Sequence, residues 1–525
     1  MGIGPTYRFV RHWPSNLDVR RGVRSSDYSQ DDWHPESKEG GGGMTTAIAL
    51  PSLKLSESER DSAALLRAQL QRVALKNRFK ADLYEGKHCA EDLGISAPAG
   101  LPGLIEAVIG WPGTVVDVLE ERLEFQGWTG ADDLTLSDVM VDNDLAVESG
   151  RGHLDAFTYG CGFVSVGRGM ADEPDVLVSV ESTESCTVEW DYRLRRAKSA
   201  LSQTRDRHGV PIMETLYLPD ETIRFERTRG ELVIVDRDPH KLGRVPVARM
   251  LNRERASDVH GRSEITRAVV YLTNAAIRTL TGMEINREFY TTPKWTALNT
   301  DPAVFGMSED NSPEENRKAG WTSTSGRLNA IPPQVDDDGN IVEPKLHEFR
   351  PAPPTPYIDQ VRAYSMLLAA ECGFPSSYLG FVTENPPSAD SIRQQEYRLV
   401  KRAERRQTSF GLAWREVAYL SMLFRDGSVD PAVFRKIGVK WRDASTPTRA
   451  AAADEAAKLI GAEVLPPDST VTYDRIGLSL QEQQQLERDR RQGGTQSLVD
   501  RLTSTPLPAT VPNPPADAVQ QAVGQ

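Results

Sequence analysis

The chain has 525 residues, which is enough for several domains with cores of their own. It is 39% hydrophobic and 26% charged, a balance typical of folded globular proteins, and its formal net charge is -13. Tight binding of DNA without sequence preference needs many Lys and Arg contacts to phosphates, so this acidic balance excludes a protein that holds a duplex over its whole surface.

Cysteine usage and hydropathy indicate an intracellular protein. The four cysteines are far apart and form no CxxC pair, so we expect reduced, mostly buried thiols. No apolar run approaches the ~18–20 residues needed to span a bilayer, and the N-terminus lacks the apolar core of a signal peptide. These features predict a protein that is made in the cytoplasm and has no membrane partner.

Both ends of the chain differ in composition from the middle. Residues 1–43 are polar, show no sustained period, and finish with a Lys-Glu-Gly-Gly-Gly-Gly stretch before Met44. Two interpretations stay open, a disordered arm or an upstream segment that precedes a natural start at Met44. Residues 493–525 are rich in Pro, Gly, Gln, Ala and Thr, so they offer little to bury and are predicted to form a flexible tail.

The first half of the folded part predicts an α+β domain. A helix over Ser56–Leu83 has Ser56 as its cap and Glu59 three residues on, which is the pattern of a capping box. Apolar spacing favours two further helices, over Leu104–Ile109 and Asp138–Tyr159. Short runs rich in Val, Ile, Thr and aromatic residues then predict antiparallel strands over Cys161–Val166, Val176–Val180, Thr187–Tyr192, Met213–Leu218, Thr222–Arg227 and Leu232–Asp236.

The centre of the chain predicts a long helix followed by an excursion. Ser263 is the expected cap of the helix, and Glu264 favours its N-terminus electrostatically. Apolar residues recur at helical spacing as far as Tyr290. Residues 291–354 break this pattern with short β-like pieces, and we expect them to fold as a small unit of their own.

A second central helix, over residues 355–375, returns from this excursion. Thr355 is its expected cap, and Gly373 is expected to end it. Residues 376–387 then form a loop, and a long helix follows over residues 388–425. The chain is therefore predicted to run from one helix through an excursion into a returning helix that ends in a loop.

The first half of the long helix carries a basic stretch. Its members are Arg393, Arg398, Lys401, Arg402, Arg405 and Arg406. Two interpretations stay open: the stretch contacts DNA, or it is a solvated face that forms salt bridges with Glu396 and Glu404. Two further helices are predicted after it, over Thr448–Ile460 and Leu480–Arg491.

No residue pattern points to catalysis. The eight histidines form no HExxH or HxH motif and no Cys/His spacing suited to zinc, and neither a GK[ST] loop nor a Gly-x-Ser-x-Gly elbow is present. Asp336-Asp337-Asp338-Gly339 is either a hairpin turn or a cation site, and it lacks the downstream ligands of an EF-hand loop. We expect no catalytic residue, no cofactor and no metal.

Several short segments stand around the central helices in a fixed order. They are Gly261-Arg262-Ser263-Glu264-Ile265 running into Leu272–Leu280, then Tyr378-Leu379-Gly380-Phe381, Asn385–Arg393 and Leu399–Gln407. In this order and spacing they resemble the portal protein family of tailed bacteriophages, in the branch common among phages of actinobacteria. The resemblance covers roughly Met44 to Arg491.

The resemblance implies a mainly α-helical α+β portal fold with an antiparallel β-sheet wing, a two-helix stem, a small α/β clip and a helical crown. It divides the chain into an arm or upstream segment at 1–43, the wing at 44–259, a stem helix at 260–290, the clip at 291–354, the returning stem helix at 355–375, a tunnel loop at 376–387, a long helix with a return to the wing at 388–447, the crown region at 448–492 and a tail at 493–525. The extra N-terminal arm and the short crown region depart from the simplest pattern of the family.

The resemblance also implies a function. It implies a dodecameric ring at one vertex of the virion capsid, through which the terminase large subunit packages double-stranded DNA that later leaves by the same channel. The scaffold, the major capsid protein and a head-tail connector are the other implied partners. The tunnel-loop residues implied to face DNA are Val382, Thr383, Glu384 and Asn385. The rival interpretations are a DNA-processing enzyme, such as a terminase subunit or nuclease, and another structural protein of the particle.

Overall fold

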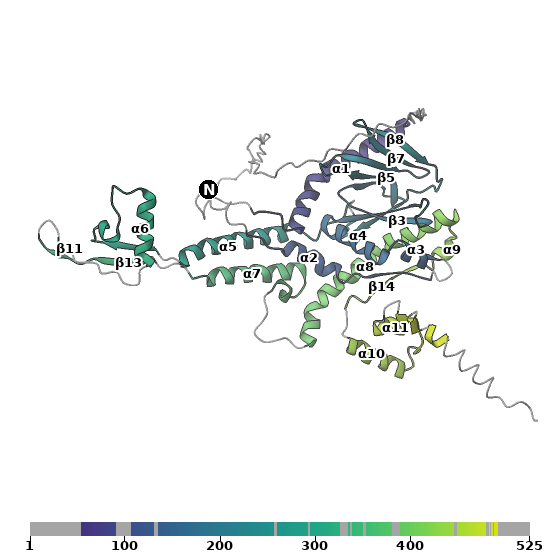
Figure 1. Ribbon diagram of the computed structural model, residues 1–525. Coiled ribbons are helices and arrows are strands. Elements are labelled where there is room, and N and C mark those ends of the chain that lie inside the picture. Colours follow the sequence, from purple (N-terminus) through teal and green to yellow (C-terminus); the bar gives the residue numbers. More distant parts are fainter. Residues whose placement is uncertain are drawn as a thin grey trace, which may run out of the picture. The chain divides into compact units, whose positions relative to one another are not determined.

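The computed structural model describes residues 54–90, 107–130, 135–256, 260–291, 294–325, 334–335, 339–349, 353–380, 389–445, 449–478, 482–483, 485–486 and 488–491. All of them belong to one unit of the chain, residues 52–525 (Figure 1). None of the described helices is long and apolar enough to cross a membrane.

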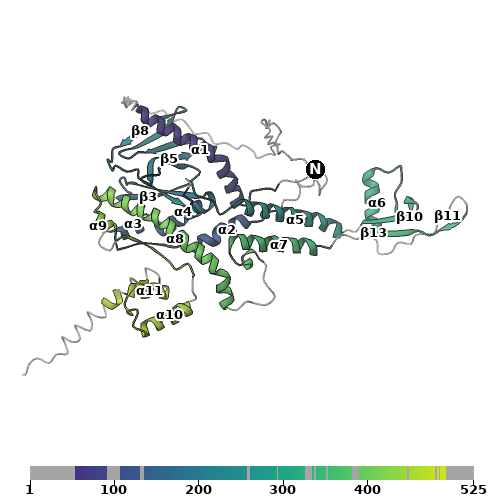
Figure 2. The same ribbon diagram turned by 180° about the vertical axis from the view of Figure 1, so that it is seen from behind.

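The described residues form both helices and strands (Figures 1 and 2). The helices are α1 (Glu57–Tyr84), α2 (Trp111–Glu120), α3 (Leu136–Asp142), α4 (Leu145–Tyr159), α5 (Arg267–Thr291), α6 (Pro313–Ser325), α7 (Thr355–Cys372), α8 (Ala389–Asp426), α9 (Pro431–Phe434), α10 (Arg449–Gly461) and α11 (Thr470–Ile476), with short 3-10 turns η1 (Pro302–Phe305) and η2 (Ser376–Leu379). The strands are β1 (Phe125–Thr129), β2 (Cys161–Arg168), β3 (Val176–Glu181), β4 (Cys186–Asp191), β5 (Arg196–Arg205), β6 (Pro211–Tyr217), β7 (Thr222–Thr228), β8 (Glu231–Asp238), β9 (Val247–Leu251), β10 (Lys294–Leu298), β11 (Gln334–Val335), β12 (Ile341–Val342), β13 (Lys345–Phe349) and β14 (Gly438–Trp441).

Antiparallel pairing joins these strands, as predicted. A five-stranded sheet has the order β4-β5-β6-β7-β8, and a three-stranded sheet has the order β3-β2-β9. β1 pairs with β14, which brings together segments more than 300 residues apart in the chain. The prediction of an α+β fold with antiparallel sheets is therefore confirmed.

Alternate residues of the central strands point into different cores, which shows how the layers are stacked. On β5, Leu201 lies in a core with α1, whereas Ala200 lies in a second core with the three-stranded sheet. On β2, Phe163 lies in that second core, whereas Val164 lies in a third core with α4 and α8. The order of layers is thus α1, the five-stranded sheet, the three-stranded sheet, and finally α4 with α8.

Local sequence signals account for several helix ends. The predicted capping box is present, because Glu59 N–H donates to the Ser56 hydroxyl at 3.4 Å and Ser56 N–H donates back to the Glu59 carboxylate at 3.0 Å. α7 ends at Gly373, which has φ +74, as its sequence predicts. Its N-cap is Pro354, so the prediction that Thr355 caps this helix is wrong.

The predicted helix over Asp138–Tyr159 is two helices in the structure. α3 ends at Asp142, and α4 begins after Asp144, whose φ of +48 cannot continue a right-handed helix. The Asn143 side chain bonds β3, which holds the break in place. The prediction of a helix over Leu104–Ile109 is also wrong for the residues that the structure describes. Residues 107–110 are irregular, and α2 begins at Trp111.

The excursion between α5 and α7 combines strands and helices. Antiparallel strands β10 and β13 close it, η1 and α6 follow β10, and β11 pairs with β12. Asp336, Asp337 and Asp338, for which the sequence left a hairpin turn and a cation site open, lie outside the described residues.

An aromatic cluster joins α4 to α8 in the third core. The Trp414 indole N–H donates to Nε2 of His153 at 3.1 Å, and both side chains have an exposed fraction of 0%. Phe125 stacks on Trp414 with ring centroids 4.4 Å apart, and the Trp128 indole N–H donates to the Trp414 carbonyl at 2.9 Å. Burial lowers the pKa of His153 to about 3, so the ring is neutral and carries its proton on Nδ1.

Replacing His153 with Gln should remove a pH dependence from folding. The unfolded histidine takes up a proton below its ordinary pKa of 6.5, whereas the folded one stays neutral down to about 3. The unfolded state binds more protons in this window, so wild-type stability falls as the pH falls. Between pH 7 and pH 5, urea unfolding should show the wild type losing about 2 kcal/mol more than His153→Gln. Equal losses in the two proteins would contradict this prediction.

Candidate functional site

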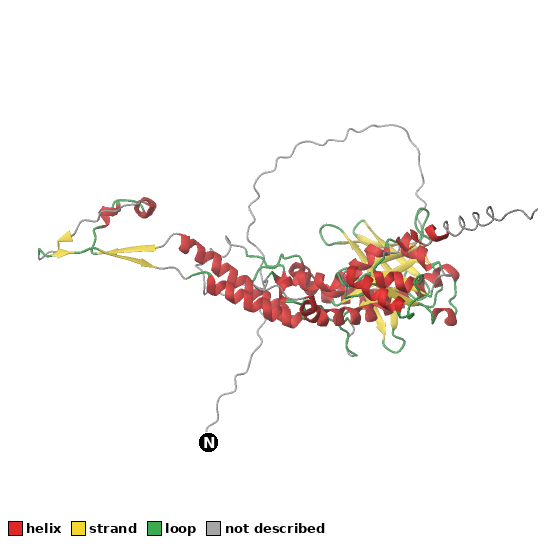
Figure 3. Ribbon diagram, turned by 90° about the horizontal axis from the view of Figure 1, so that it is seen from below, coloured by secondary structure: helices red, strands yellow, loops and turns green. Residues whose placement is uncertain are grey.

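The two central helices lie side by side and form the first part of the candidate site (Figures 1 and 3). Leu272 and Ala276 of α5 and Leu368 of α7 belong to the same buried cluster. Gly282 lies beside the ring of Tyr357, where a Cβ would be in ordinary contact at 3.4 Å. The predicted helix–excursion–helix arrangement is therefore present.

The turn that leads into α5 explains the first of the sequence motifs. Gly261 has φ +60, and a Cβ there would lie 2.2 Å from the Gly160 carbonyl oxygen and 2.5 Å from that of Asn252. Only glycine fits such a position. Asn252 N–H donates to the Gly160 carbonyl at 3.0 Å, and Arg262 N–H donates to the Asn252 carbonyl at 2.7 Å. The motif therefore fastens the start of the helix pair to the end of α4.

Ser263 and Glu264 have roles other than the predicted ones. α5 begins at Arg267, so Ser263 is not its cap. The Ser263 hydroxyl instead donates to the Thr158 carbonyl at 2.6 Å and accepts from Ile265 N–H at 3.0 Å. Glu264 precedes the helix and is 1% exposed, which places its charge inside the protein. Glu264 was predicted to stabilise the N-terminus of the central helix electrostatically. In the structure it forms buried contacts instead.

Glu264 is bound by arginines from α8. Arg402 donates to one carboxylate oxygen at 2.6 Å, and Arg406 donates to the other at 2.9 Å. Arg253 lies 3.5 Å away, and the Asn252 amide donates at 3.2 Å. Burial works to raise the pKa of Glu264, but the Arg402 and Arg406 charges outweigh it and hold that pKa below its ordinary value. We call Glu264, Arg402 and Arg406 the carboxylate hub.

The sequence analysis missed this hub, although a signal for it exists. Leu399, Ala403 and Phe410 form a buried stripe along α8, and Arg406 occupies a position on the same stripe. A charged residue in an apolar stripe calls for a buried partner of opposite sign. The sequence does not show which carboxylate supplies it, because Glu264 is 142 residues away from Arg406.

The other residues of the basic stretch have different surroundings. Lys401 forms an exposed ion pair with Glu404 at 2.6 Å, and Arg398 donates to the Ala370 carbonyl of α7 at 2.8 Å. Arg393 and Arg405 have exposed side chains. The basic stretch looks uniform in the sequence. In the structure, some of its side chains bind other parts of the chain and others are exposed at the surface.

The anchors on both sides of the predicted tunnel loop are tied to each other. The Tyr378 hydroxyl of η2 donates to the Glu396 carboxylate of α8 at 2.5 Å. Arg122 lies between them, 3.1 Å from the Tyr378 hydroxyl and 3.2 Å from Glu396. Burial and the nearby Glu396 raise the pKa of Tyr378 above its ordinary value. The four candidate DNA-facing residues, Val382, Thr383, Glu384 and Asn385, lie outside the described residues.

We call Arg122, Tyr378 and Glu396 the Arg122 triad. Its contacts correct one expectation about the basic stretch. Glu396 was expected to pair with its neighbours on α8, but it pairs with Arg122, which follows α2. Within the described ranges, no group of three or more His, Cys, Asp or Glu side chains is arranged to hold a metal ion. The contacts of Arg122, Tyr378 and Glu396 connect the end of α2, η2 and α8.

Replacing Glu264 with Gln should destabilise the protein by about 3–5 kcal/mol at pH 7, because Arg402 and Arg406 would stay buried without their charge partner. Glu404→Gln is the matched control, since it removes only the exposed pair with Lys401 and should change stability by less than about 1 kcal/mol. Denaturant unfolding measures both, and equal effects would contradict the role of the hub.

The same variant should also show a defined pH dependence. The folded pKa of Glu264 lies below its unfolded value of 4.5, so the stability that it contributes is present above that value. That contribution is lost as the pH falls through the lowered folded pKa. The difference in unfolding free energy between wild type and Glu264→Gln should therefore become smaller in acid. A difference that stays constant with pH would contradict a charged carboxylate in the hub.

Comparison with known proteins agrees with the sequence motifs. The family described as phage portal protein, SPP1 Gp6-like, matches residues 113–492. The portal protein of Mycobacterium phage D29 is 32% identical over 451 residues, which cover 83% of this chain and 90% of the relative. The portal protein of Mycobacterium phage L5 is 30% identical over 446 residues, covering 82% and 88%.

Among solved structures, a chain from the neck of the native gene transfer agent particle is 13% identical, with a TM-score of 0.38. The match covers 77% of this chain and 99% of that one.

The family match includes α2, the helix pair, the hub and the long helix α8. It confirms the resemblance stated from the motifs, including the branch found in actinobacterial phages. The chain therefore belongs to the phage portal protein family and functions as a portal protein.

Proposed function

We propose that this portal protein closes into a dodecameric ring at one capsid vertex and that double-stranded DNA passes through its channel. The observation that carries the proposal is the helix pair, which buries one side and leaves large apolar side chains exposed on another. Tyr271 is 63% exposed, Met366 58% and Leu367 57%. Large apolar side chains with this exposure are typical of a protein–protein interface, and neighbouring copies in a ring would cover them.

The described elements support a division of the chain into the regions of a portal subunit. We assign α1 to α4 and the sheets other than those of β10 to β13 to the wing. We assign α5 and α7 to the stem, and β10 to β13 with α6 to the clip. α8 returns to the wing, and α10 and α11 form the C-terminal crown region. On this assignment the carboxylate hub joins wing to stem, and the Arg122 triad lies where the stem turns into the tunnel loop.

The proposed partners follow from this arrangement. The terminase large subunit drives DNA through the ring during packaging, because no nucleotide-binding loop occurs in this sequence. The major capsid protein and the scaffold surround the ring during assembly, and a head-tail connector binds it afterwards. The DNA leaves through the same channel when the particle ejects its genome.

We propose that the tunnel loop guides DNA mechanically. Many cationic contacts to phosphates would hold DNA in place, whereas a channel must let it slide. Val382, Thr383, Glu384 and Asn385 carry one negative charge and no positive charge. With its anchors tied by Tyr378 and its α8 partner, the loop can touch DNA while the rest of the stem stays fixed.

Deleting Val382 to Asn385 should leave the ring intact but impair packaging or retention of DNA. The deletion removes the proposed contact with DNA and spares the helix pair. Negative-stain imaging of the purified protein tests the ring, and the fraction of DNA-filled heads in a complementation assay tests packaging. A monomeric wild-type protein would refute the ring, and full heads with the deletion would refute the role of the loop.

The basic stretch of α8 serves mainly as framework in this proposal, since Arg398, Lys401, Arg402 and Arg406 contact other residues of the chain. Neutralising Arg393, Lys401 and Arg405 to Gln together should keep the yield of DNA-filled heads within about twofold of wild type, because exposed charges add little to folding. A large loss of filled heads, with rings intact, would show that this face contacts phosphates.

A further inference from the structure

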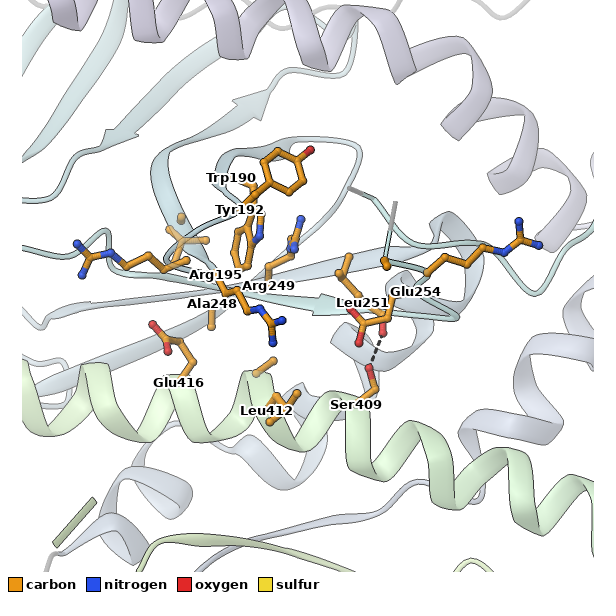
Figure 4. Close-up of a pocket in the computed structure, with 16 residues that line it drawn as sticks. Trp190, Tyr192, Arg195, Ala248, Arg249, Leu251, Glu254, Ser409, Leu412 and Glu416 are labelled. Atoms are coloured by element: carbon orange, nitrogen blue, oxygen red, sulfur yellow. Dashed lines mark hydrogen bonds between the residues drawn. The ribbon is translucent and has the colours of Figure 1, made fainter. Parts of the chain in front are cut away.

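A cleft of about 620 Å³ opens between the five-stranded sheet, the three-stranded sheet and α8 (Figure 4). Trp190 and Tyr192 lie on its strand side, and Ser409, Leu412 and Glu416 face them from α8. Neither helix of the central pair, α5 or α7, contributes to its walls. The roles assigned so far therefore leave this cleft unexplained.

The floor of the cleft includes an edge strand. β9 is the outer strand of the three-stranded sheet and pairs on one side with β2. The hydrogen-bonded positions of this pair alternate, so the backbone groups of Val247, Arg249 and Leu251 point away from β2. The Ser409 hydroxyl already donates to the Leu251 carbonyl at 3.0 Å. An edge of this kind can bind a further segment of polypeptide.

The opposite edge of the same sheet is partly closed. Asn143 donates from its amide to the Val176 carbonyl of β3 at 3.0 Å and accepts from Val178 N–H at 2.8 Å. One side chain thus satisfies two outward backbone groups of β3. In the part of the sheet that the structure describes, the edge at β9 is the one that borders a cleft.

The cleft has an excess of positive charge. Arg195 and Arg255 are exposed at its rim, and Arg196 is half-buried. The Arg249 guanidinium lies 3.5 Å from the centre of the Trp190 ring, and burial lowers its pKa to about 10, so it is still charged at neutral pH. Together these groups favour an occupant with carboxylates.

The carboxylates of the cleft offset only part of this charge, because four arginines and two glutamates line it. Glu416 is bound by Arg244 at 2.6 Å, so its charge is already paired, and Glu254 is a second acidic residue among the lining side chains. Leu412 and Tyr192 are 63% and 62% exposed at the rim. The occupant that fits is an acidic segment with an apolar side chain.

The turn between β2 and β3 has this chemistry. It spans Gly169–Asp175 and carries the carboxylates of Asp172, Glu173 and Asp175, and its Met170 is 59% exposed. Met170 N–H donates to the Glu173 carboxylate at 2.9 Å, and Gly169 N–H donates to the Asp175 carbonyl at 3.3 Å. The turn is therefore held in one conformation before it meets a partner, which lowers the entropy lost on binding.

We propose that the cleft beside β9 receives the acidic turn Gly169–Asp175 of a second copy of this chain. The turn connects β2 to β3, away from the β9 edge, and is absent from the residues that line the cleft of its own chain. Each copy thus offers two different surfaces and contacts the next copy head to tail, as a closed ring requires. The inference rests on the proposed ring and names the contact that closes it in the wing.

Charge reversal on each surface tests the contact. Asp172→Arg with Asp175→Arg, and separately Arg195→Glu with Arg255→Glu, should each raise the concentration for half-assembly by about tenfold or more, because like charges then face each other. Combining the four changes should bring that concentration back to within about threefold of wild type. Sedimentation velocity over a concentration series measures assembly.

A matched control uses the turn between β7 and β8, where Arg229→Glu with Glu231→Arg reverses two exposed charges and should leave assembly unchanged. If the wild type and the first two charge-reversal variants all assemble equally well, this contact is wrong and the ring proposal still stands. A wild type that stays monomeric at every concentration would overturn both.

Cross-linking tests the same contact without changing charges. In a Cys89→Ser background, Met170→Cys with Leu412→Cys should give disulfide-linked multimers under mild oxidation. Met170→Cys with Val147→Cys is the control, because Val147 is 64% exposed on α4 and outside the cleft. Equal cross-linking of both pairs, or none in the first pair, would overturn the proposal.

Discussion

The buried carboxylate of Glu264 determines where the central helix pair leaves the sheets. A carboxylate removed from water needs partners of opposite charge, and both close partners come from α8. Since Arg402 and Arg406 stand one helical turn apart, they fix the position of α8 along the segment that leads into α5. The same segment is held to α4 by the turn at Gly261, where a Cβ would meet two carbonyl oxygens. Charge pairing and a steric restriction thus fix one junction together.

The same face of α8 continues this role towards the tunnel loop. Arg398 donates to the Ala370 carbonyl and packs over Gly373, where a Cβ would lie 2.8 Å from its side chain. Two residues earlier in α8, Glu396 accepts from Tyr378. α8 therefore holds the start of α5, the end of α7 and the first turn of the loop. In the proposed ring, cations that are used internally would not be available to phosphates, which favours a channel that DNA can slide through.

Much of this fold can be predicted from local sequence signals. The capping box at Ser56, the stop at Gly373 and most strand positions depend on residues that are close in the chain. The break at Asn143 and the true start of α5 could not be predicted, because they depend on contacts with β3 and α8. β1, β5, β9 and β14 were missed for a similar reason. β1 and β14 are short and pair across most of the chain, and the small residues of β5 give no clear alternation.

Net charge sets the condition for self-association. At -13 per chain, copies repel one another on average, so a ring needs local surfaces of opposite sign. The three-stranded sheet supplies such a pair, because its acidic turn lies between β2 and β3 and its arginine-lined cleft lies beside β9. A two-fold dimer uses both surfaces only where the turn and the cleft meet reciprocally, whereas a single head-to-tail contact leaves one turn and one cleft unused. A third copy can then bind, and addition stops only when the rotation between neighbours closes the ring.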